Sequence, residues 1–241
     1  MLNFAVDYHY RNMEDKKNIG HLFDGIAGTY DLLNHLLSLN IDKSWRRKTV
    51  AMLKPCSQIL DVAIGTADLS LEIMRQKKAT QIQGLDVSAE MMKIGEQKVA
   101  KAGLEGKILF DLGSALEMPY GDASYDAVTC AYGVRNFPDA DKGLQEFFRV
   151  MKPGGQLAIL EFSYPTNPVI RWGYDLFFSN ILPMIGRIIS KDKGAYAYLN
   201  ESVKDFMWGE EMCEHIRAVG FRDVKFKTLT FGITTVYTAI K

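Results

Sequence analysis

The sequence predicts an α/β fold, and three observations carry that prediction. Short apolar runs alternate with stretches of helical spacing between residues 59 and 161, as in parallel strands joined by helices. The first run, Ile59–Val62, is followed by a turn of small residues and then by a helix pattern. A second run, Ile82–Leu85, ends at Asp86, 21 positions after Gly65 (65 to 86). We therefore expect a seven-stranded, mostly parallel, doubly wound (Rossmann-like) sheet with an antiparallel edge strand.

The elements follow one another in a regular order. The first 55 residues have a helical pattern, with Tyr30 and Ile41 among the spaced apolar positions, and Pro55 ends it. Ser88 is the expected N-cap of one later helix, and Lys152-Pro153-Gly154-Gly155 is expected to end another. The predicted strands in the first part of the sheet are residues 59–62, 81–86, 107–111, 125–131 and 156–161, and the predicted helices are residues 68–76, 89–102 and 142–151.

The alternation stops at residues 167–190, which are too apolar for a surface linker. Arg171, Asp175 and Arg187 argue against a membrane span there, so we interpret the stretch as an inserted helical cover. The regular pattern then returns. The last predicted elements are a helix at residues 210–219, closed by Gly220, and an antiparallel pair of edge strands at residues 224–228 and 234–240.

The composition narrows the classes of protein. The chain has 241 residues, 47% hydrophobic and 24% charged, so one globular domain with a full core is expected. Lys and Arg number 29, as do Asp and Glu, which gives a formal net charge of zero. Because nucleic-acid binding needs an excess of positive charge, we expect no nucleic-acid partner.

The cysteines and the ends of the sequence suggest a location. Cys56, Cys130 and Cys213 are scattered, and no pair has the spacing of a metal site. Such a set is typical of buried thiols in a reducing compartment. Residues 1–11 lack the basic-then-apolar order of a signal peptide, and no window of about 18 apolar residues exists. We therefore expect a cytoplasmic protein that needs no metal.

The turn after the first strand fits a nucleoside, since parallel sheets bind such ligands at the carboxyl ends of their strands. The dinucleotide fingerprint has glycines at three places, which are Ala63, Gly65 and Asp68 here. A carboxylate at the third place would repel a pyrophosphate, which argues against NAD and FAD. A cationic, phosphate-free ligand fits better, and S-adenosylmethionine carries a sulfonium and an ammonium on an adenosine.

Three acids are the candidate contacts of such a ligand. Asp61 and Asp68 are available for its cationic end, and Asp86 for its ribose hydroxyls. Each acid alone also has a structural explanation, as a favourable first-turn charge or a strand-end acid. Their placement together at the tips of adjacent strands favours a site. After the third strand, Ser114 and Ala115 are candidates for the adenine edge.

Several blocks of sequence match a known family in order. The most specific are the Arg135-Asn136 pair within residues 132–136 and the Tyr-x-Tyr-Leu-x-Glu-Ser block at 196–202. The chain resembles the class I S-adenosylmethionine-dependent methyltransferases, and more narrowly the ubiquinone/menaquinone biosynthesis C-methyltransferases. The remaining matching blocks are residues 23–34, 60–69, 115–120, 150–155, 160–163 and 182–186.

The resemblance implies cofactor contacts, by position, at Thr66, Asp86, Ser114 and Ala115. Some members have a serine where this chain has Ala131, so no side-chain bond is expected there.

Ile64 and Ala67 stand where some members have glycine. We expect Ala67 to be tolerated with a negative φ, and Ile64 to crowd a close backbone approach.

The resemblance also implies methylation of a ring carbon on a prenylated quinol. We favour 2-demethylmenaquinol, with 2-methoxy-6-polyprenyl-benzoquinol as the close second. An aromatic carbon attacks a sulfonium methyl group only after a neighbouring hydroxyl loses its proton. The enzyme must therefore align the two reactants and stabilise a phenolate.

Arg135 and Asn136 follow the fourth strand, where they would lie beside the cofactor. A guanidinium there would stabilise phenolate charge, although arginine stays charged and does not take the proton itself. Tyr30 is a candidate to orient the ring, with a role as a core aromatic equally open. Asp31, His35 or a bound water is the candidate proton acceptor.

The apolar run from Val169 to Ile189 is interpreted as a lid that gives the prenyl tail a dry channel, and plain helix packing explains it nearly as well. Such a lid also suits a peripheral contact with the inner membrane face, and a homo-oligomer is compatible with the sequence. The single domain, 1–241, divides into a helical cap (1–55), a cofactor-binding core (56–166), the lid (167–205) and a carboxyl-terminal helix with edge strands (206–241).

Three other functions stay open. A methyltransferase acting on oxygen or on a sterol-like carbon would share the cofactor turn without needing Arg135-Asn136. A nonenzymatic sensor would bind the nucleoside without turnover. A nicotinamide dehydrogenase is disfavoured by Asp68.

Overall fold

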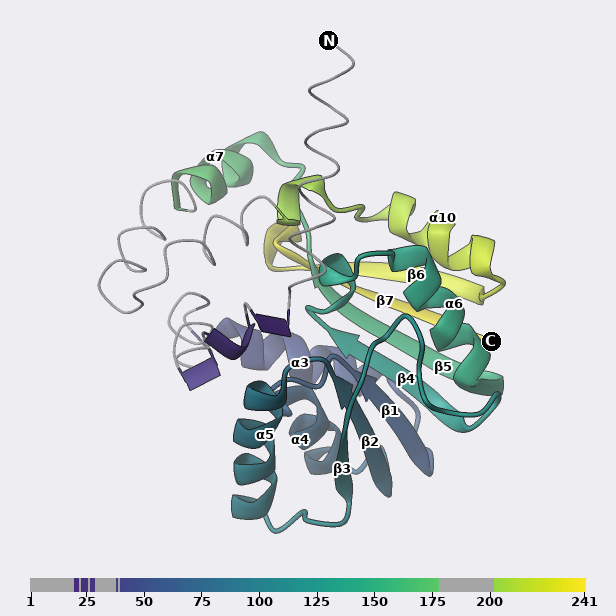
Figure 1. Ribbon diagram of the computed structural model, residues 1–241. Coiled ribbons are helices and arrows are strands. Elements are labelled where there is room, and N and C mark those ends of the chain that lie inside the picture. The colour runs from purple at the N-terminus through teal and green to yellow at the C-terminus, as the bar shows by residue number, and fades with distance from the viewer. Residues whose placement is uncertain (1–19, 22, 26, 29–37, 39, 178–201) are drawn as a thin grey trace.

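The computed structural model describes residues 20–21, 23–25, 27–28, 38, 40–177 and 202–241. A seven-stranded sheet with the order β3-β2-β1-β4-β5-β7-β6 organises these residues (Figure 1). β7 runs antiparallel to both of its neighbours, and all other pairings are parallel. The predicted mostly parallel sheet with an antiparallel pair at one edge is confirmed. The strands are β1 (Gln58–Val62), β2 (Gln81–Asp86), β3 (Ile108–Leu112), β4 (Tyr125–Ala131), β5 (Met151–Phe162), β6 (Arg222–Leu229) and β7 (Thr234–Ile240).

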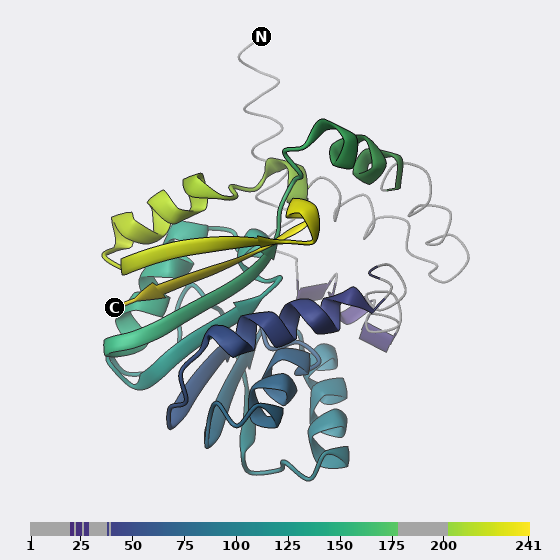
Figure 2. The same ribbon diagram turned by 180° about the vertical axis from the view of Figure 1, so that it is seen from behind.

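Helices cover both faces of the sheet, as a doubly wound fold requires. The face seen in Figure 2 is covered by α3 (Ile41–Met52), α4 (Asp68–Arg75) and α5 (Ala89–Lys101). The opposite face is covered by α6 (Ala140–Val150) and α10 (Glu210–Val219). A further helix, α7 (Pro168–Leu176), lies beyond the carboxyl ends of the strands.

Side chains of each strand alternate between two apolar cores. Ile59 and Ile82 pack with α3, α4 and α5, whereas Leu60 and Val62 pack with α6 and α10. This is the period of two expected for a strand buried on both faces. Each of these fully buried side chains stabilises the fold by roughly 1.5–3 kcal/mol.

The Lys152–Gly155 stretch differs from its prediction as a turn before the fifth strand. It belongs to β5, which already begins at Met151. Tyr125 pairs with Met151, and the next pair is Ala127 with Gln156, so the four residues between form a bulge. The left-handed φ of Gly154, 78°, allows the strand to accommodate them.

Side chains cap the starts of α5 and α6. Ser88 Oγ accepts a hydrogen bond from Met91 N at 3.2 Å, which confirms the predicted cap of α5. Asp139 caps α6 by accepting from Lys142 N, so this helix starts two residues earlier than predicted.

The predicted cap at residues 1–55 and lid at 167–205 lie partly outside the described residues. Of the lid, α7 is described, capped by Asn167 with Pro168 in its first turn. Of the cap, α3 is described, and the described residues between 20 and 28 are helical. None of the helices in the described parts is long and apolar enough to cross a bilayer.

Candidate active site

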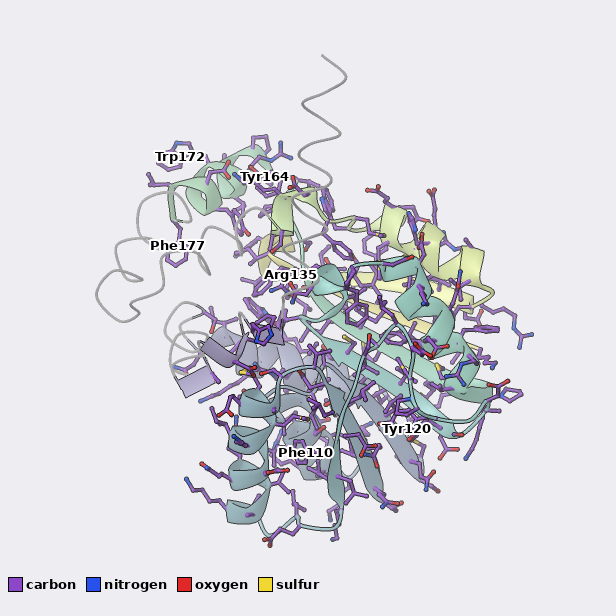
Figure 3. The ribbon with its side chains drawn as sticks, in the orientation of Figure 1. Phe110, Tyr120, Arg135, Tyr164, Trp172 and Phe177 are labelled. Carbon is purple, nitrogen blue, oxygen red and sulfur yellow. The ribbon has the colours of Figure 1, made fainter. Side chains whose placement is uncertain are left out.

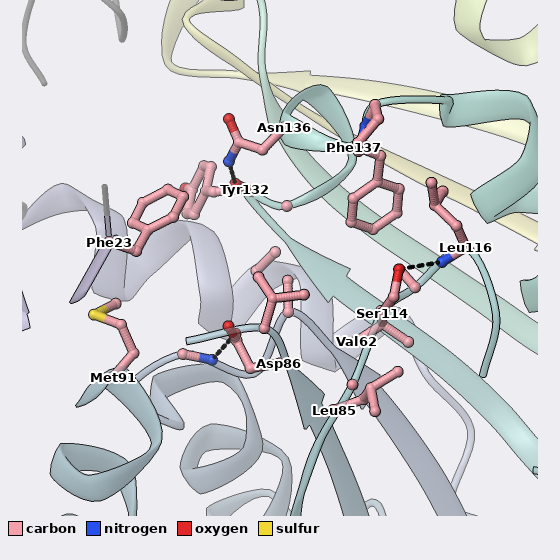
Figure 4. Close-up of a pocket in the computed structure, with 18 residues that line it drawn as sticks. Phe23, Val62, Leu85, Asp86, Met91, Ser114, Leu116, Tyr132, Asn136 and Phe137 are labelled. Carbon is pink, nitrogen blue, oxygen red and sulfur yellow. Dashed lines mark hydrogen bonds between the residues drawn. The ribbon is translucent and has the colours of Figure 1, made fainter. Parts of the chain in front are cut away.

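A pocket opens at the carboxyl ends of β1, β2 and β4, where the strand order reverses (Figure 4). Counted with its open mouth, the hollow measures about 690 Å³. No Lys, Arg or His is among the described residues that line it. The lining residues are Phe23, Val62, Ala63, Gly65, Leu85, Asp86, Val87, Met91, Gly113, Ser114, Ala115, Leu116, Ala131, Tyr132, Gly133, Asn136, Phe137 and Pro138.

The turn after β1 is held in a left-handed backbone at alternate residues. Ala63, Gly65 and Ala67 have φ values of 57°, 52° and 65°. The expectation of a negative φ for Ala67 is therefore wrong. An alanine in this region is strained by about 1–2 kcal/mol, which the surrounding packing must offset.

Ile64 does not crowd the pocket, contrary to expectation. Its side chain turns away from the ligand side and packs above Gly84 of β2, within the core under α4 and α5. A Cβ atom at Gly84 would lie 2.2 Å from Ile64 Cδ1, so the glycine makes the room that Ile64 needs. The turn thus presents backbone to the pocket and hides its larger side chain.

Asp86 joins the turn to the pocket. Its Oδ2 accepts from Gly65 N at 2.8 Å and its Oδ1 accepts from Ser88 N at 2.9 Å. Burial raises the pKa of the carboxyl, and these backbone bonds act against that rise. Each oxygen keeps acceptor capacity toward the pocket, which suits a ligand that donates two hydroxyls.

Asp61 is placed differently although it stands on the adjacent strand. Its oxygens accept from Ser70 Oγ at 2.6 Å and from Thr129 Oγ1 at 2.7 Å. The residue is 1% exposed and does not line the pocket. Burial raises its pKa to about 6, against the two hydroxyl bonds that lower it. Its predicted contact with a ligand stays a prediction.

Thr66 and Asp68 also lie outside the lining. Lys98 of α5 donates to Thr66 Oγ1 at 3.1 Å and pairs with Asp68. Arg46 of α3 lies 3.3 Å from the other carboxylate oxygen of Asp68. Two cations therefore balance the charge of Asp68. The argument from the sequence that Asp68 would repel a pyrophosphate is weakened accordingly.

Ser114 and Ala115 line the pocket, and their contact with an adenine edge stays a prediction. Ser114 Oγ accepts from Leu116 N at 3.1 Å, which fixes the loop after β3. Val87 also lines the pocket and is 44% exposed, so it offers a ligand an apolar surface.

The turn after β4 brings side chains to the pocket. Tyr132 has a φ of 59°, and its carbonyl accepts from Arg135 NH1 at 2.6 Å and Asn136 Nδ2 at 3.1 Å. The Tyr132 ring stacks on Phe162 at 4.5 Å between centroids. Tyr132 and Asn136 line the pocket, whereas Arg135 does not.

Arg135 is held beneath this turn by Glu161 at the end of β5. Arg135 NH1 lies 2.7 Å from Glu161 Oε1, and both side chains are almost fully buried. Glu161 also accepts from the backbone N–H groups of Arg135 and Phe162. Figure 3 shows Arg135 between the strand ends and α7. A buried guanidinium in this place can act through the field it creates at the pocket.

Tyr30, predicted to orient the substrate, lies outside the described residues, as do Asp31 and His35. Phe23 lines the pocket from the amino-terminal region. Its neighbour Asp24 accepts from Ser88 Oγ at 2.6 Å and from Glu90 N at 3.2 Å, which docks this segment on the start of α5.

Phe23, Met91, Tyr132 and Phe137 are pocket residues that the sequence did not single out. The only available signal was for Tyr132, which directly follows a predicted strand. No cluster of three or more His, Cys, Asp or Glu side chains suited to a metal occurs among the described residues.

Comparison with known proteins gives a consistent result. The model of the ubiE/COQ5 methyltransferase family matches residues 11–241. The chain is 44% identical over 227 residues to a demethylmenaquinone methyltransferase of Bacteroides fragilis, covering 93% of each chain. It is 42% identical over 235 residues to a ubiquinone/menaquinone biosynthesis C-methyltransferase UbiE of Geotalea daltonii, covering 96% of this chain and 100% of the relative.

Solved structures share the fold at low sequence identity. An S-adenosylmethionine-dependent methyltransferase from Thermotoga maritima has a TM-score of 0.66 at 16% identity, covering 92% of this chain and 99% of that one. Another such methyltransferase, from Aquifex aeolicus, has a TM-score of 0.59 at 18% identity, covering 87% and 97%.

Proposed function

The chain belongs to the ubiE/COQ5 methyltransferase family, and from that premise we propose that it methylates a ring carbon of a prenylated quinol. We propose 2-demethylmenaquinol as the substrate and menaquinol as the product, with the 2-methoxy-6-polyprenyl-benzoquinol of ubiquinone biosynthesis as the alternative. The observation that carries the proposal is the pocket itself, where the acid Asp86 and the amide Asn136 line one hollow at the strand switch point.

The residues present fit S-adenosylmethionine as the cosubstrate. The described lining offers the carboxylate of Asp86 to hydroxyl donors, and no Lys, Arg or His among its residues could pair with a phosphate. A sulfonium and an ammonium carry the opposite charge and suit this lining. We propose that Asp86 holds the ribose hydroxyls, that Ser114 and Ala115 meet the adenine edge, and that the turn at Gly65 faces the amino-acid end.

Bound there, S-adenosylmethionine supplies an electrophilic methyl group. The protein must then promote loss of a proton from the quinol hydroxyl beside the attacking carbon. We propose that Arg135 favours the phenolate by its charge, while its contact with Glu161 keeps it fixed. Asn136 lines the pocket and is the proposed direct contact of the ring oxygen. Tyr30 is proposed to orient the ring, and Asp31, His35 or a water to accept the proton.

A prenylated quinol dissolves in a bilayer, so the enzyme must meet a membrane surface. α7 supports this because its polar residues face the protein: Asp175 accepts from Tyr164 Oη, and Arg171 lies over the Tyr164 ring. Its outer side is apolar, with Val169 75% and Trp172 69% exposed (Figure 3). We propose that this side contacts the membrane peripherally, with the protein on the cytoplasmic, inner face.

Purified protein tests the proposed reaction directly. It is given S-adenosylmethionine labelled in its methyl group, together with either reduced demethylated quinol in detergent. We expect label in the naphthoquinol ring. Label in the benzoquinol alone would move the assignment to the alternative. Retained cosubstrate binding with no label in either lipid would support a sensor instead.

Vesicles test the proposed membrane contact. Trp172→Ala should reduce sedimentation with anionic vesicles without changing turnover of a short-chain, water-soluble quinol. Leu112→Ala is the matched control, because Leu112 is 63% exposed at the far edge of the sheet. Equal vesicle binding by both variants and the parent protein would contradict a contact through α7.

A further inference from the structure

Asp68 stands at the start of α4, immediately after the turn that faces the pocket, yet two cations from other helices hold it. Lys98 of α5 pairs with one carboxylate oxygen, and Arg46 of α3 lies 3.3 Å from the other. The three side chains are between 9% and 24% exposed, so solvent screens their attraction only in part.

This cluster reaches the turn at a second point. Lys98 Nζ also donates to Thr66 Oγ1 at 3.1 Å. On the other side, Arg46 pairs with Asp42 at 2.5 Å, within α3. Thr66 and Asp68 flank Ala67, so Lys98 contacts the turn on both sides of its last left-handed residue, and Arg46 contacts it at Asp68.

The turn needs such support because its local interactions are poor. Ala67 has a φ of 65° and occupies the N-cap position of α4, where it offers no side-chain acceptor. A left-handed alanine is strained, and α4 lacks the stabilisation of a side-chain cap. The ion pairs of Asp68 with Lys98 and Arg46 fix the first residue of α4 to two neighbouring helices and so restrain the turn from outside.

We propose that Asp68, with Lys98 and Arg46, is a positioning residue that holds the cosubstrate turn in its binding shape and does not contact the cosubstrate. Three observations carry this: the double ion pair, the absence of Asp68 from the pocket lining, and the uncapped left-handed Ala67. The inference deepens the proposed function, because it takes S-adenosylmethionine as the ligand of that turn.

A truncated ligand separates this role from direct contact. 5′-Methylthioadenosine keeps the adenosine and sulfur but lacks the amino-acid end and the sulfonium charge. A carboxylate that binds the ammonium or the sulfonium affects only the complete ligand. A carboxylate that shapes the turn affects both ligands, because Gly65 N of the turn donates to Asp86 Oδ2 and Asp86 is the proposed contact of the ribose that both ligands carry.

The experiment measures the Kd of each ligand by calorimetry for Asp68→Asn and the parent protein. We expect Asp68→Asn to raise both Kd values by a similar factor, about tenfold. A loss confined to S-adenosylmethionine would overturn the proposal in favour of direct contact. An unchanged Kd for both ligands would also overturn it.

Lys98 supplies a second variant in case Asp68→Asn folds poorly. Lys98→Met should weaken both ligands, Lys98→Arg should restore most of the affinity, and Lys98→Met should add little to Asp68→Asn. Lys152→Met is the matched control, since Lys152 pairs with Asp126 at 2.8 Å away from the turn. If the effects of the Lys98 and Asp68 changes on the Kd values were fully additive, the two residues would not act through one ion pair, and the proposal would be contradicted.

These outcomes are distinct from failure of the proposed reaction. All binding measurements omit the quinol, so they would test the role of Asp68, Lys98 and Arg46 even in an enzyme that methylates another acceptor. Conversely, suppose that the protein methylates neither quinol but that Asp68→Asn weakens the binding of both ligands. The positioning role of Asp68 would then stand, and the proposed quinol substrate would be wrong.

Discussion

The turns after β1 and β4 meet at the floor of the pocket but work in different ways. They are in close contact, since a Cβ atom at Gly133 would lie 2.6 Å from Ala63 Cβ. The β1 turn, residues 63–67, buries its largest side chain and presents backbone. The β4 turn, residues 132–136, lines the pocket with the side chains of Tyr132 and Asn136.

The difference separates two tasks. A backbone surface fits a ligand by shape and tolerates changes of side chain, which suits a cosubstrate shared by enzymes of many specificities. A surface of side chains sets charge and hydrogen bonding, which suits the reacting ring. We therefore expect changes in the β4 turn to affect chemistry, and changes around the β1 turn to affect cosubstrate affinity or stability.

The largest effect is expected from Arg135→Ala, which tests the β4 side. Loss of the charge that favours the phenolate should lower kcat by about 10²–10³-fold. The Kd of S-adenosylmethionine, measured by calorimetry, should stay within about twofold. Equal losses in kcat and in affinity for S-adenosylmethionine would show that the β4 turn serves cosubstrate binding as well as chemistry.

Stability must be controlled in that test. Arg135→Ala leaves the carboxylate of Glu161 buried without its ion partner, which costs about 3–5 kcal/mol. Glu161→Gln added to Arg135→Ala removes the buried charge. If thermal stability recovers in this double variant while turnover stays low, the lost turnover belongs to the guanidinium.

Asp86→Ala is expected to have the next largest effect, on binding. It removes the acceptor of the ribose hydroxyls and the partner of Gly65 N, so the Kd of S-adenosylmethionine should rise about 10²-fold. Asp111→Ala is the control, because this acid stands on the neighbouring strand β3 and is exposed. An unchanged Kd for Asp86→Ala would remove Asp86 from the site.

The third effect depends on pH and concerns Asp61. Burial raises its pKa in the folded protein to about 6, so the folded state holds this proton more tightly than the unfolded chain. The contribution to stability is full below the ordinary carboxyl pKa of about 4 and is lost as pH rises through about 6.

Urea unfolding between pH 4 and pH 7 measures this contribution, which is at most about 3 kcal/mol. Asp61→Asn should flatten the pH dependence and leave Ser70 and Thr129 with a polar partner. The same steep profile in the variant would assign the titration to another group.

The smallest effect is expected from Ala67→Gly in the β1 turn. Glycine adopts a φ of 65° without strain, so the folded state should gain about 1 kcal/mol, less the greater freedom of glycine in the unfolded chain. Calorimetric melting should show a Tm that rises by a few degrees. A lower Tm would mean that the buried methyl group of Ala67 stabilises more than its backbone strain costs.

The sequence predicts best at the carboxyl ends of strands and in the short loops that follow them. Asp86, Ser114 and Asn136 reach the pocket because strand order brings those chain positions to one edge. Asp61 was harder to assign, because its side chain turns under α4 to Ser70 rather than to the pocket. Whether an acid near a strand end points into the pocket or under a helix depends on its hydrogen-bond partners, which hydrophobic spacing does not reveal.

Long-range partners also escape prediction from the sequence. Lys98 lies 30 residues after Asp68, and nothing in its spacing marks it as an ion partner. Phe23 belongs to a segment with no strand to place it, and the contacts of Asp24 with Ser88 and Glu90 N fix that segment beside the pocket. The bulge at Lys152–Gly155 appeared in the sequence as a turn, because proline and glycine punctuate both.

The left-handed alanines of the β1 turn bear on how distant relatives are recognised. A genome search keyed to spaced glycines would pass over a chain that holds the same dihedral angles on methyl-bearing residues. Profiles that score the two cations of the helices flanking the turn, together with the turn itself, would retrieve such chains. Such profiles would also indicate which chains hold the turn with ion pairs in place of the conformational freedom of glycine.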